Sequence, residues 1–188
     1  MHTVQRQLHT DHFHLQRLLN CLSHEIKCYE YDSLEHVDLT VILSALDYVH
    51  DYPDKWHHPA EDVIFSKLQQ KDVKECPLIE QLKSEHREIV QATRTIYELF
   101  NMAAEDCIVP TNQLLATTRH YIALQKQHIH KENEYIYPLM NKVFTDEEWD
   151  TIEKAVKIRN DPLFAQQTKK EYELLYHYIF DLEAHKNH

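Results

Sequence analysis

The chain has 188 residues, of which 43% are hydrophobic, and this length is sufficient for one compact domain with a substantial core. It contains no glycine, whereas sheets joined by tight hairpins normally need glycine at positive φ angles, so an all-β or a doubly wound fold is disfavoured. The formal net charge of −11 argues against nucleic acid and anionic membranes as partners, because binding to either requires a basic face.

Four long segments carry apolar side chains at helical spacing. The first covers about residues 4–29 and the second about residues 39–70, where Pro53 removes a backbone donor and predicts a kink. The third segment follows Pro77, a residue suited to the first turn of a helix. The fourth covers about residues 111–140. The sequence therefore predicts four long helices.

The pattern changes after the fourth segment. Thr145 and Glu148 have the spacing of a capping box, which predicts a short helix that continues to Ile158. Pro162 ends this region, and a last amphipathic helix is expected over about residues 169–183. We expect this last helix to cover the bundle. A dimer interface is the alternative, so both a monomer and a homodimer remain open.

Together these segments predict an all-α fold in a single domain over residues 1–188. Short polar connections, such as residues 31–38, favour antiparallel neighbours. We expect an up-down antiparallel four-helix bundle over about residues 1–144, with accessory C-terminal helices over about residues 145–188. No apolar stretch reaches membrane-spanning length and no basic leader opens the chain, which predicts a cytoplasmic protein that does not bind membranes.

A histidine lies on the apolar stripe of each long helix. In the first helix, His12 is four residues after Leu8 and three before Leu15, so all three side chains share one face. His14 lies about 200° round the helix from His12 and is expected to point outward. In the third helix, His86 takes a stripe position in the same way. One inward histidine alone is more often a hydrogen-bonded core residue than a metal ligand.

Two of the helices add a carboxylate one turn after the histidine. His57 and Glu61 are four residues apart in the second helix, and His128 and Glu132 repeat this spacing in the fourth. A buried carboxylate is costly unless it is paired or binds a metal ion. A single pair of this kind is often exposed, so the argument depends on two pairs that both continue an apolar face.

The fourth helix offers a second pair with the same spacing. His130 and Glu134 are rotated off the stripe and are expected to be outward. Leu124 and Tyr135 are expected to flank His128 on the inward face. The pair that contains His128 is therefore preferred.

Taken together, these residues predict a metal site. Four histidines and two carboxylates without partners would destabilise one apolar bundle by many kcal/mol, whereas iron, manganese and zinc all accept imidazole and carboxylate ligands. A polar core without metal is the alternative. The predicted ligands are His12, His57, Glu61, His86, His128 and Glu132.

At these residues the sequence resembles the hemerythrin family, in its bacterial HHE cation-binding branch. The matching pieces are Asp11-His12, His57-His-Pro-Ala-Glu61, Glu85-His86, His128-Ile-His-Lys-Glu132, Tyr135-Ile-Tyr-Pro138, Asp146-Glu-Glu-Trp149 and Asn160-Asp-Pro-Leu-Phe164. The resemblance covers nearly the whole chain. It implies two iron ions joined by an oxo or hydroxo bridge, with Glu61 and Glu132 bridging and the four histidines as terminal ligands; another divalent metal remains open.

The sequence departs from the oxygen-carrying hemerythrins at two helices. Their third helix has two histidines one turn apart, whereas Leu82 and Val90 stand one turn either side of His86 here. Their fourth helix has an aspartate five residues after its histidine, whereas the corresponding glutamate here follows by four.

These departures leave a seventh ligand unassigned. His58 is the first candidate, because the iron-sensing hemerythrin domain of an F-box protein has a ligating carboxylate next to its second-helix histidine. His50, seven residues before His57, is the second candidate.

The resemblance implies a centre that binds or reacts with dioxygen or another diatomic such as nitric oxide, or that senses or handles iron. The departures favour sensing, iron handling or slow redox chemistry over oxygen carriage. A metal-dependent sensor or interaction domain and an iron donor for iron–sulfur cluster repair are the alternatives, and an enzymatic activity is left open. A ferritin-like site and a zinc hydrolase are disfavoured, because the sequence has neither Glu-x-x-His nor His-Glu-x-x-His.

Overall fold

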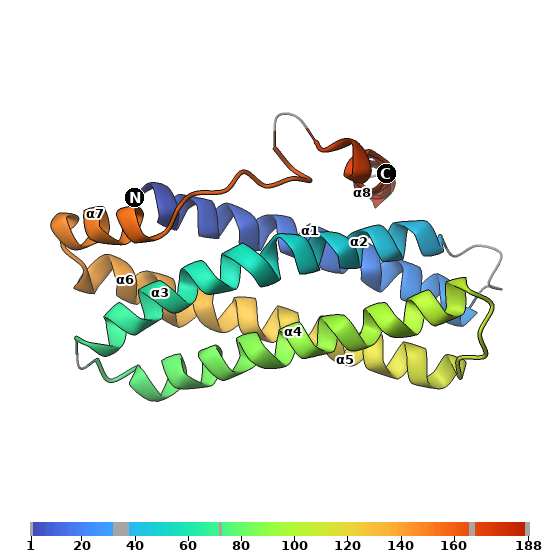
Figure 1. Cartoon of the computed structure of the whole chain (residues 1–188), viewed down its shortest axis with the longest axis horizontal. Helices are drawn as coiled ribbons and strands as arrows, with labels where there is room; N and C mark the ends of the chain where they lie inside the picture. Colours follow the sequence, from blue (N-terminus) through green and yellow to red (C-terminus); the bar gives the residue numbers. More distant parts are fainter. Residues whose placement is uncertain (1, 32–37, 72, 166–167, 187–188) are drawn as a thin grey trace.

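The computed structural model describes residues 2–31, 38–71, 73–165 and 168–186, and these ranges contain helices and no strand (Figure 1). Four long helical rods run antiparallel to their neighbours in the chain, which confirms the predicted all-α bundle. The rods are α1 (Thr3–Tyr31); α2 (Leu39–Asp51) with α3 (His58–Gln69); α4 (Cys76–Ala104); and α5 (Thr111–Lys131) with α6 (Tyr137–Val143). The predicted connection over residues 31–38 falls mostly outside the described residues.

Two of the rods are interrupted by a π-helical turn. The first, η2, covers Pro53–His57 and joins α2 to α3, so the predicted interruption at Pro53 takes this form. The second, η3, covers Glu132–Ile136 and joins α5 to α6. A π turn holds one residue more than an α turn, so the inward face is displaced by one position beyond it.

The second π turn overturns one expectation. Tyr135, which was expected beside His128 on the inward face, is 55% exposed, whereas Ile136 and Tyr137 are buried. An uninterrupted α-helix would have placed residue 135 two turns after His128 on the same face, and the extra residue of η3 moves that face along the chain.

The apolar core is divided into two clusters along the bundle axis. One cluster contains Leu8 of α1 and Leu82 of α4, and the other contains Leu15 of α1 and Ile89 of α4. On each of these two helices the predicted ligand histidine lies between the two clusters. The fold therefore holds a belt of buried polar side chains in the middle of an apolar bundle.

The C-terminal region adds two helices outside the four rods. Helix α7 (Asp146–Ala155) begins with both hydrogen bonds of the predicted capping box, but it ends at Ala155 rather than at Ile158. Residues 156–165 then return along the bundle without forming a helix, and η4 (Lys170–Tyr172) and α8 (Glu173–Lys186) follow further along the chain. Within the described ranges, no helix combines the length and the apolar character needed to cross a bilayer.

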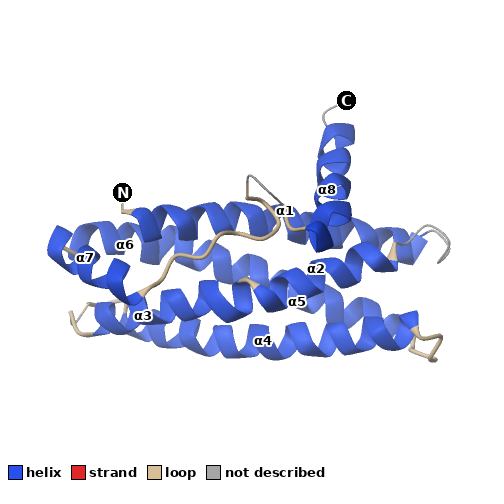
Figure 2. Cartoon of the chain, turned by 45° about the horizontal axis from the view of Figure 1, so that its top comes forward, coloured by secondary structure: helices blue, strands red, loops and turns tan. Residues whose placement is uncertain are grey.

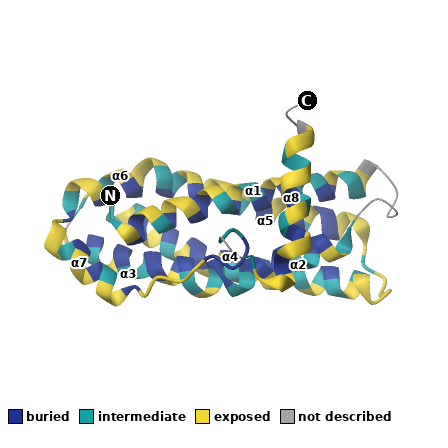
Figure 3. Cartoon of the chain, turned by 90° about the horizontal axis from the view of Figure 1, so that it is seen from above, coloured by how far each residue is buried: buried dark blue, intermediate teal, exposed yellow. Residues whose placement is uncertain are grey.

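Helix α8 covers only part of the bundle. Its buried residues Leu175 and Ile179 pack with α1 and α2. Figure 2 shows the helix projecting away from the rods, and Figure 3 shows that much of its surface is exposed. Leu174 and Phe180 are 53% and 41% exposed, so the expectation that this helix covers the bundle holds for its buried face alone.

Candidate metal centre

The residues predicted as metal ligands come together in the polar belt. Each of the six is at most 3% exposed: His12, His57, Glu61, His86, His128 and Glu132. The two carboxylates lie at the centre and the imidazoles surround them through their Nε2 atoms. The Nε2 to carboxylate distances are 3.6 and 3.1 Å from His12 to Glu61 and Glu132, 3.4 Å from His57 to Glu61, 3.5 and 3.4 Å from His86 to Glu61 and Glu132, and 3.1 Å from His128 to Glu132.

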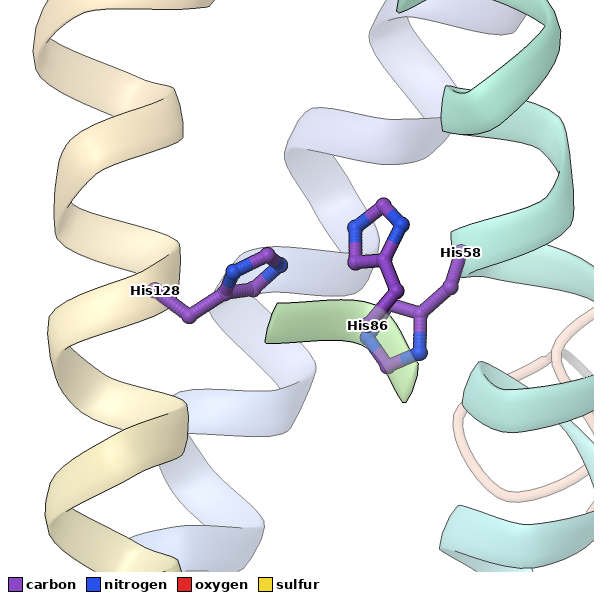
Figure 4. Close-up of side chains that lie close together, drawn as sticks. All are labelled: His58, His86 and His128. Carbon is purple, nitrogen blue, oxygen red and sulfur yellow. The ribbon is translucent and has the colours of Figure 1, made fainter. Parts of the chain in front are cut away.

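His58 joins this cluster from the N-terminus of α3. Its ring stacks on His86 with 4.6 Å between centroids and meets His128 edge-on, and Figure 4 shows the three imidazoles approaching from three helices. One ligand atom from each of these three histidines lies within 4.8 Å of the others. Glu61 follows His57 by four residues and follows His58 by three. The two imidazoles therefore project on either side of Glu61 around the helix.

The cluster has two unequal sides. His58, His86 and His128 form one side, whereas His12 and His57 form the other with Glu61. The carboxylate of Glu61 lies within reach of His12 and His57, and also of His86 and His128. It therefore reaches both sides of the cluster. The arrangement can hold two cations, one with three imidazoles and one with two.

Four outer side chains orient the histidines in a closed ring. Their contacts to Nδ1 are Asp11 to His57 at 3.1 Å, Asp62 to His86 at 2.8 Å, Glu85 to His128 at 3.1 Å, and Asn133 to His12 at 2.9 Å. Each outer residue is adjacent in sequence to a central residue of its own rod and holds the histidine of a neighbouring rod. Such partners fix the ring orientation and aim Nε2 at the centre.

Several inward atoms have no hydrogen-bond partner among the described residues. They are Nε2 of His57, His86 and His128, Oε2 of Glu61 and both carboxylate oxygens of Glu132; Nδ1 of His58, on the side of Asp54, is unpaired as well. Buried polar groups are normally satisfied, and a set of unpaired imidazole nitrogens facing unpaired carboxylate oxygens is the donor set of a metal site. The residues present therefore fit a buried metal centre.

The two carboxylates control the titration of the imidazoles. Burial alone lowers the pKa of His12, but the adjacent carboxylates of Glu132 and Glu61 raise it to about 10. The same balance raises the pKa of His86, where Asp62 also contributes. By contrast, burial and the neighbouring histidines lower the pKa of His58 well below its ordinary value. The carboxylates thus attract positive charge to the centre of the cluster.

The other histidines singled out in the sequence lie elsewhere. His50 is half-buried in a pocket with Asp47 and Glu98 and belongs to none of the potential ligand groups among the described residues. His14 is not among the central residues of the cluster and groups instead with Asp11 and Asp161, but it is not outward: Phe164 of the C-terminal segment stacks on it at 4.3 Å and Asp161 binds its Nδ1 at 2.7 Å. The expectation failed because the C-terminal segment covers that face of α1.

The pair formed by His130 and Glu134 is exposed, as expected. Sequence reasoning assigned no role to the four ring residues, although Asp11 and Glu85 each directly precede a stripe histidine. A polar residue next to a stripe residue lies about 100° round the helix and faces the neighbouring helix, which is a signal that could have found them.

Tyr137 is a further residue that sequence reasoning missed. Its hydroxyl donates a hydrogen bond to Glu61, and its ring is parallel to that of His12 with 5.0 Å between centroids. The side chain is 1% exposed and lies on the side of the cluster that has two imidazoles. Its sequence signal was hidden by the change of helical phase at η3.

An antiparallel bundle with this buried set of imidazoles and carboxylates defines a helical protein whose core is suited to cations. The model of the Hemerythrin HHE cation binding domain matches residues 3–140, so the chain belongs to the hemerythrin family. The match covers the four rods up to α6 and leaves α7 and α8 outside. No curated protein sequence matches the chain.

Proposed function

We propose that this chain is a non-haem di-iron protein that reacts with dioxygen or a related diatomic such as nitric oxide, in the service of iron sensing, iron handling or slow redox chemistry. His12 and His57 would hold one iron, and His58, His86 and His128 the other. Glu61 and Glu132 would bridge the two, as expected from the family resemblance. The observation that carries the proposal is the set of buried imidazole and carboxylate atoms that face one another without other partners.

The unequal sides of the cluster favour a ligand-binding centre over a purely structural one. The side with His12 and His57 has one imidazole fewer than the other side, so an ion held there would have one protein ligand fewer and could take a small molecule in its place. When bound, two irons supply redox chemistry and a coordination position for a small molecule. Every donor in the cluster is nearly inaccessible to water, so a diatomic suits the centre better than a charged metabolite.

Side chains of the protein supply a proton and exclude water on the side of the cluster that has His12 and His57. The Tyr137 hydroxyl keeps a proton directed at Oε1 of Glu61, at 2.7 Å, on the side with two imidazoles. Burial and the charges of Glu61 and Glu132 raise the pKa of Tyr137 well above its ordinary value, which keeps the phenol protonated. The apolar clusters on either side exclude bulk water.

One contact favours sensing over oxygen carriage. Asp11, which orients His57, also accepts a hydrogen bond from the Tyr52 hydroxyl, at 3.2 Å. The same hydroxyl lies 3.1 Å from the carbonyl oxygen of Arg159, in the C-terminal segment. The cluster is thus in contact, through two side chains, with a segment outside the matched domain, and this contact can transmit a change at the centre to the C-terminal region.

The test is to measure metal content and the optical spectrum before and after oxygen. We expect two irons per chain, and a new visible charge-transfer band when the anaerobically reduced protein is exposed to dioxygen or nitric oxide. A colourless protein that holds stoichiometric zinc and does not respond to either gas would overturn the proposal. Iron binding without any optical response would contradict the reaction with a diatomic and would support iron handling alone.

A further inference from the structure

Asp54 is a buried carboxylate that the cluster described above does not use. It lies in η2, its side chain is 2% exposed, and neither of its oxygens has a hydrogen-bond partner among the described residues. A buried carboxylate without partners is costly to the fold, so its presence calls for a functional explanation.

Orienting His58 is the simplest role for Asp54, but the geometry does not provide it. The separation between Asp54 Oδ1 and His58 Nδ1 is 3.6 Å, and neither atom is hydrogen-bonded. The four ring contacts to the other histidines are 2.8–3.1 Å and are hydrogen bonds. Asp54 is therefore close to the three-imidazole side of the cluster without being locked to it.

Thr93 links Asp54 to a surface pocket between α2 and α4. Thr93 is a neighbour of Asp54 and lines this pocket, whose cavity volume is about 220 Å³. Side chains that can bind cations also line it: Asp47, His50 and Glu98. Side chains that can bind a metal ion are thus present at the pocket, at Asp54 and at His58, which adjoins the cluster.

The charge along this line favours a cation. Arg94 is the positive side chain of the pocket lining, against the two carboxylates of Asp47 and Glu98; behind them lies Asp54, whose pKa burial raises to about 7, so an arriving cation competes there with a proton. Clefts of one sign concentrate counter-ions and raise the rates at which they arrive. Carboxylate oxygens and imidazole nitrogens are both ligands for divalent ions such as iron and manganese, so this line of side chains offers the same ligand types as the cluster.

We propose that this pocket is the entry path for divalent metal, with Asp47, His50 and Glu98 as the outer binding site and Asp54 as the inner transfer ligand that delivers the ion to His58. The proposal rests on the proposed metal centre, and it assigns a kinetic role to residues that are not among its final ligands. A transfer ligand has to be free of strong protein partners, and neither oxygen of Asp54 meets the geometry of a hydrogen bond to another described residue.

The experiment measures the rate of metal uptake by the chelated, metal-free full chain after anaerobic addition of ferrous ion, using rapid desalting and metal analysis. We expect Asp54→Asn to slow uptake by about tenfold while the final stoichiometry stays at the wild-type value. The double variant Asp47→Asn, Glu98→Gln is expected to raise the ferrous concentration needed for half-maximal rate. Glu171→Gln changes an exposed acid of a different pocket and serves as the matched control.

The outcomes separate the alternatives. Uptake by Asp54→Asn at the wild-type rate would overturn the entry path. Normal uptake with faster release of iron to a chelator would overturn it too, because that result makes Asp54 an orienting residue of His58. A wild-type chain that takes up no metal under any condition would contradict the metal centre itself. Circular dichroism melting of each variant establishes that it is folded before its rate is compared.

Discussion

The hydroxyl group of Tyr137 donates a 2.7 Å hydrogen bond to Oε1 of Glu61 and lies 3.3 Å from Nε2 of His12. This contact joins the start of α6 to a carboxylate of α3 and a histidine of α1, next to the side of the cluster that has two imidazoles. It places a protonated phenol where a small ligand would bind, and its removal should be measurable.

Tyr137→Phe is predicted to destabilise the metal-free protein by about 1–3 kcal/mol, because a buried carboxylate oxygen loses its donor. The loss should be smaller with metal bound, since the ion compensates the carboxylate charge. Urea unfolding of both forms measures the difference. Tyr135→Phe is the control, because Tyr135 is exposed two residues away. Equal effects of the two substitutions would show that the hydrogen bond to Glu61 contributes nothing.

Glu85→Gln is predicted to weaken metal binding by about 10- to 100-fold, the usual effect of changing a partner of a metal-ligating histidine. Glu85 binds Nδ1 of His128 at 3.1 Å and also pairs with Lys131, so its negative charge supports the imidazole. Competition with a chelator measures the affinity. Glu88→Gln alters an exposed carboxylate one turn further along α4 and should leave the affinity unchanged.

His128→Ala is predicted to abolish metal binding at one of the two positions, whereas His130→Ala should retain the full content. The two histidines are two residues apart, but His128 is buried in the cluster and His130 is exposed. Metal analysis of the purified variants makes the comparison. Loss of metal from the His130 variant alone would mean that the wrong face of the fourth rod had been assigned.

The stabilising effect of metal is predicted to grow as the pH rises from about 6.5 to 10. The pKa of His12 is raised from 6.5 to about 10 in the metal-free fold, so its contribution to stability is complete below pH 6.5 and is lost as the pH rises through about 10. Metal binding requires neutral imidazole and therefore strengthens over the same interval. Thermal unfolding at several pH values measures the difference in melting temperature between the metal-bound and the metal-free protein. A difference that becomes smaller towards pH 10 would contradict the assignment of His12 as a metal ligand.

Acidification should act on the metal-free protein through the two carboxylates. Burial raises the pKa of Glu132, but His128, His12 and His86 lower it well below 4.5 overall, and the pKa of Glu61 is also lowered by neighbouring imidazoles. Their contribution is present above about pH 4.5 and is lost as the pH falls below that value. The metal-free protein should therefore be most stable between about pH 4.5 and 6.5.

The sequence was sufficient to predict the rods and the central residues wherever the α-helical period is unbroken. In α1 and α4 the stripe positions of His12 and His86 follow directly from the spacing of leucine and isoleucine. Which residues face inward beyond η3 could not be predicted, because a π turn leaves no clear mark in the sequence. As a result Tyr135 was predicted to face inward, whereas Tyr137 does so. The cover over His14 depends on a segment about 150 residues away in the chain, which no local pattern reveals.

The ring of Nδ1 contacts has a symmetry that the sequence does not display. The first half of the chain supplies Asp11-His12 and His57 with Glu61-Asp62, and the second supplies Glu85-His86 and His128 with Glu132-Asn133. Exchanging the halves maps each contact of the ring onto another, although Asn133 supplies an amide oxygen where Asp62 supplies a carboxylate oxygen.

One pair of positions makes the number of imidazoles unequal. His58 follows His57, whereas the equivalent position after His128 is Ile129, a buried apolar residue. The inequality of the two sides therefore resides in one imidazole, and replacing His58 by isoleucine would give a centre with two imidazoles on each side. The number of imidazoles on the two sides of the cluster thus differs through one side chain, and in the proposed centre the side with two imidazoles is the one where an external ligand would bind.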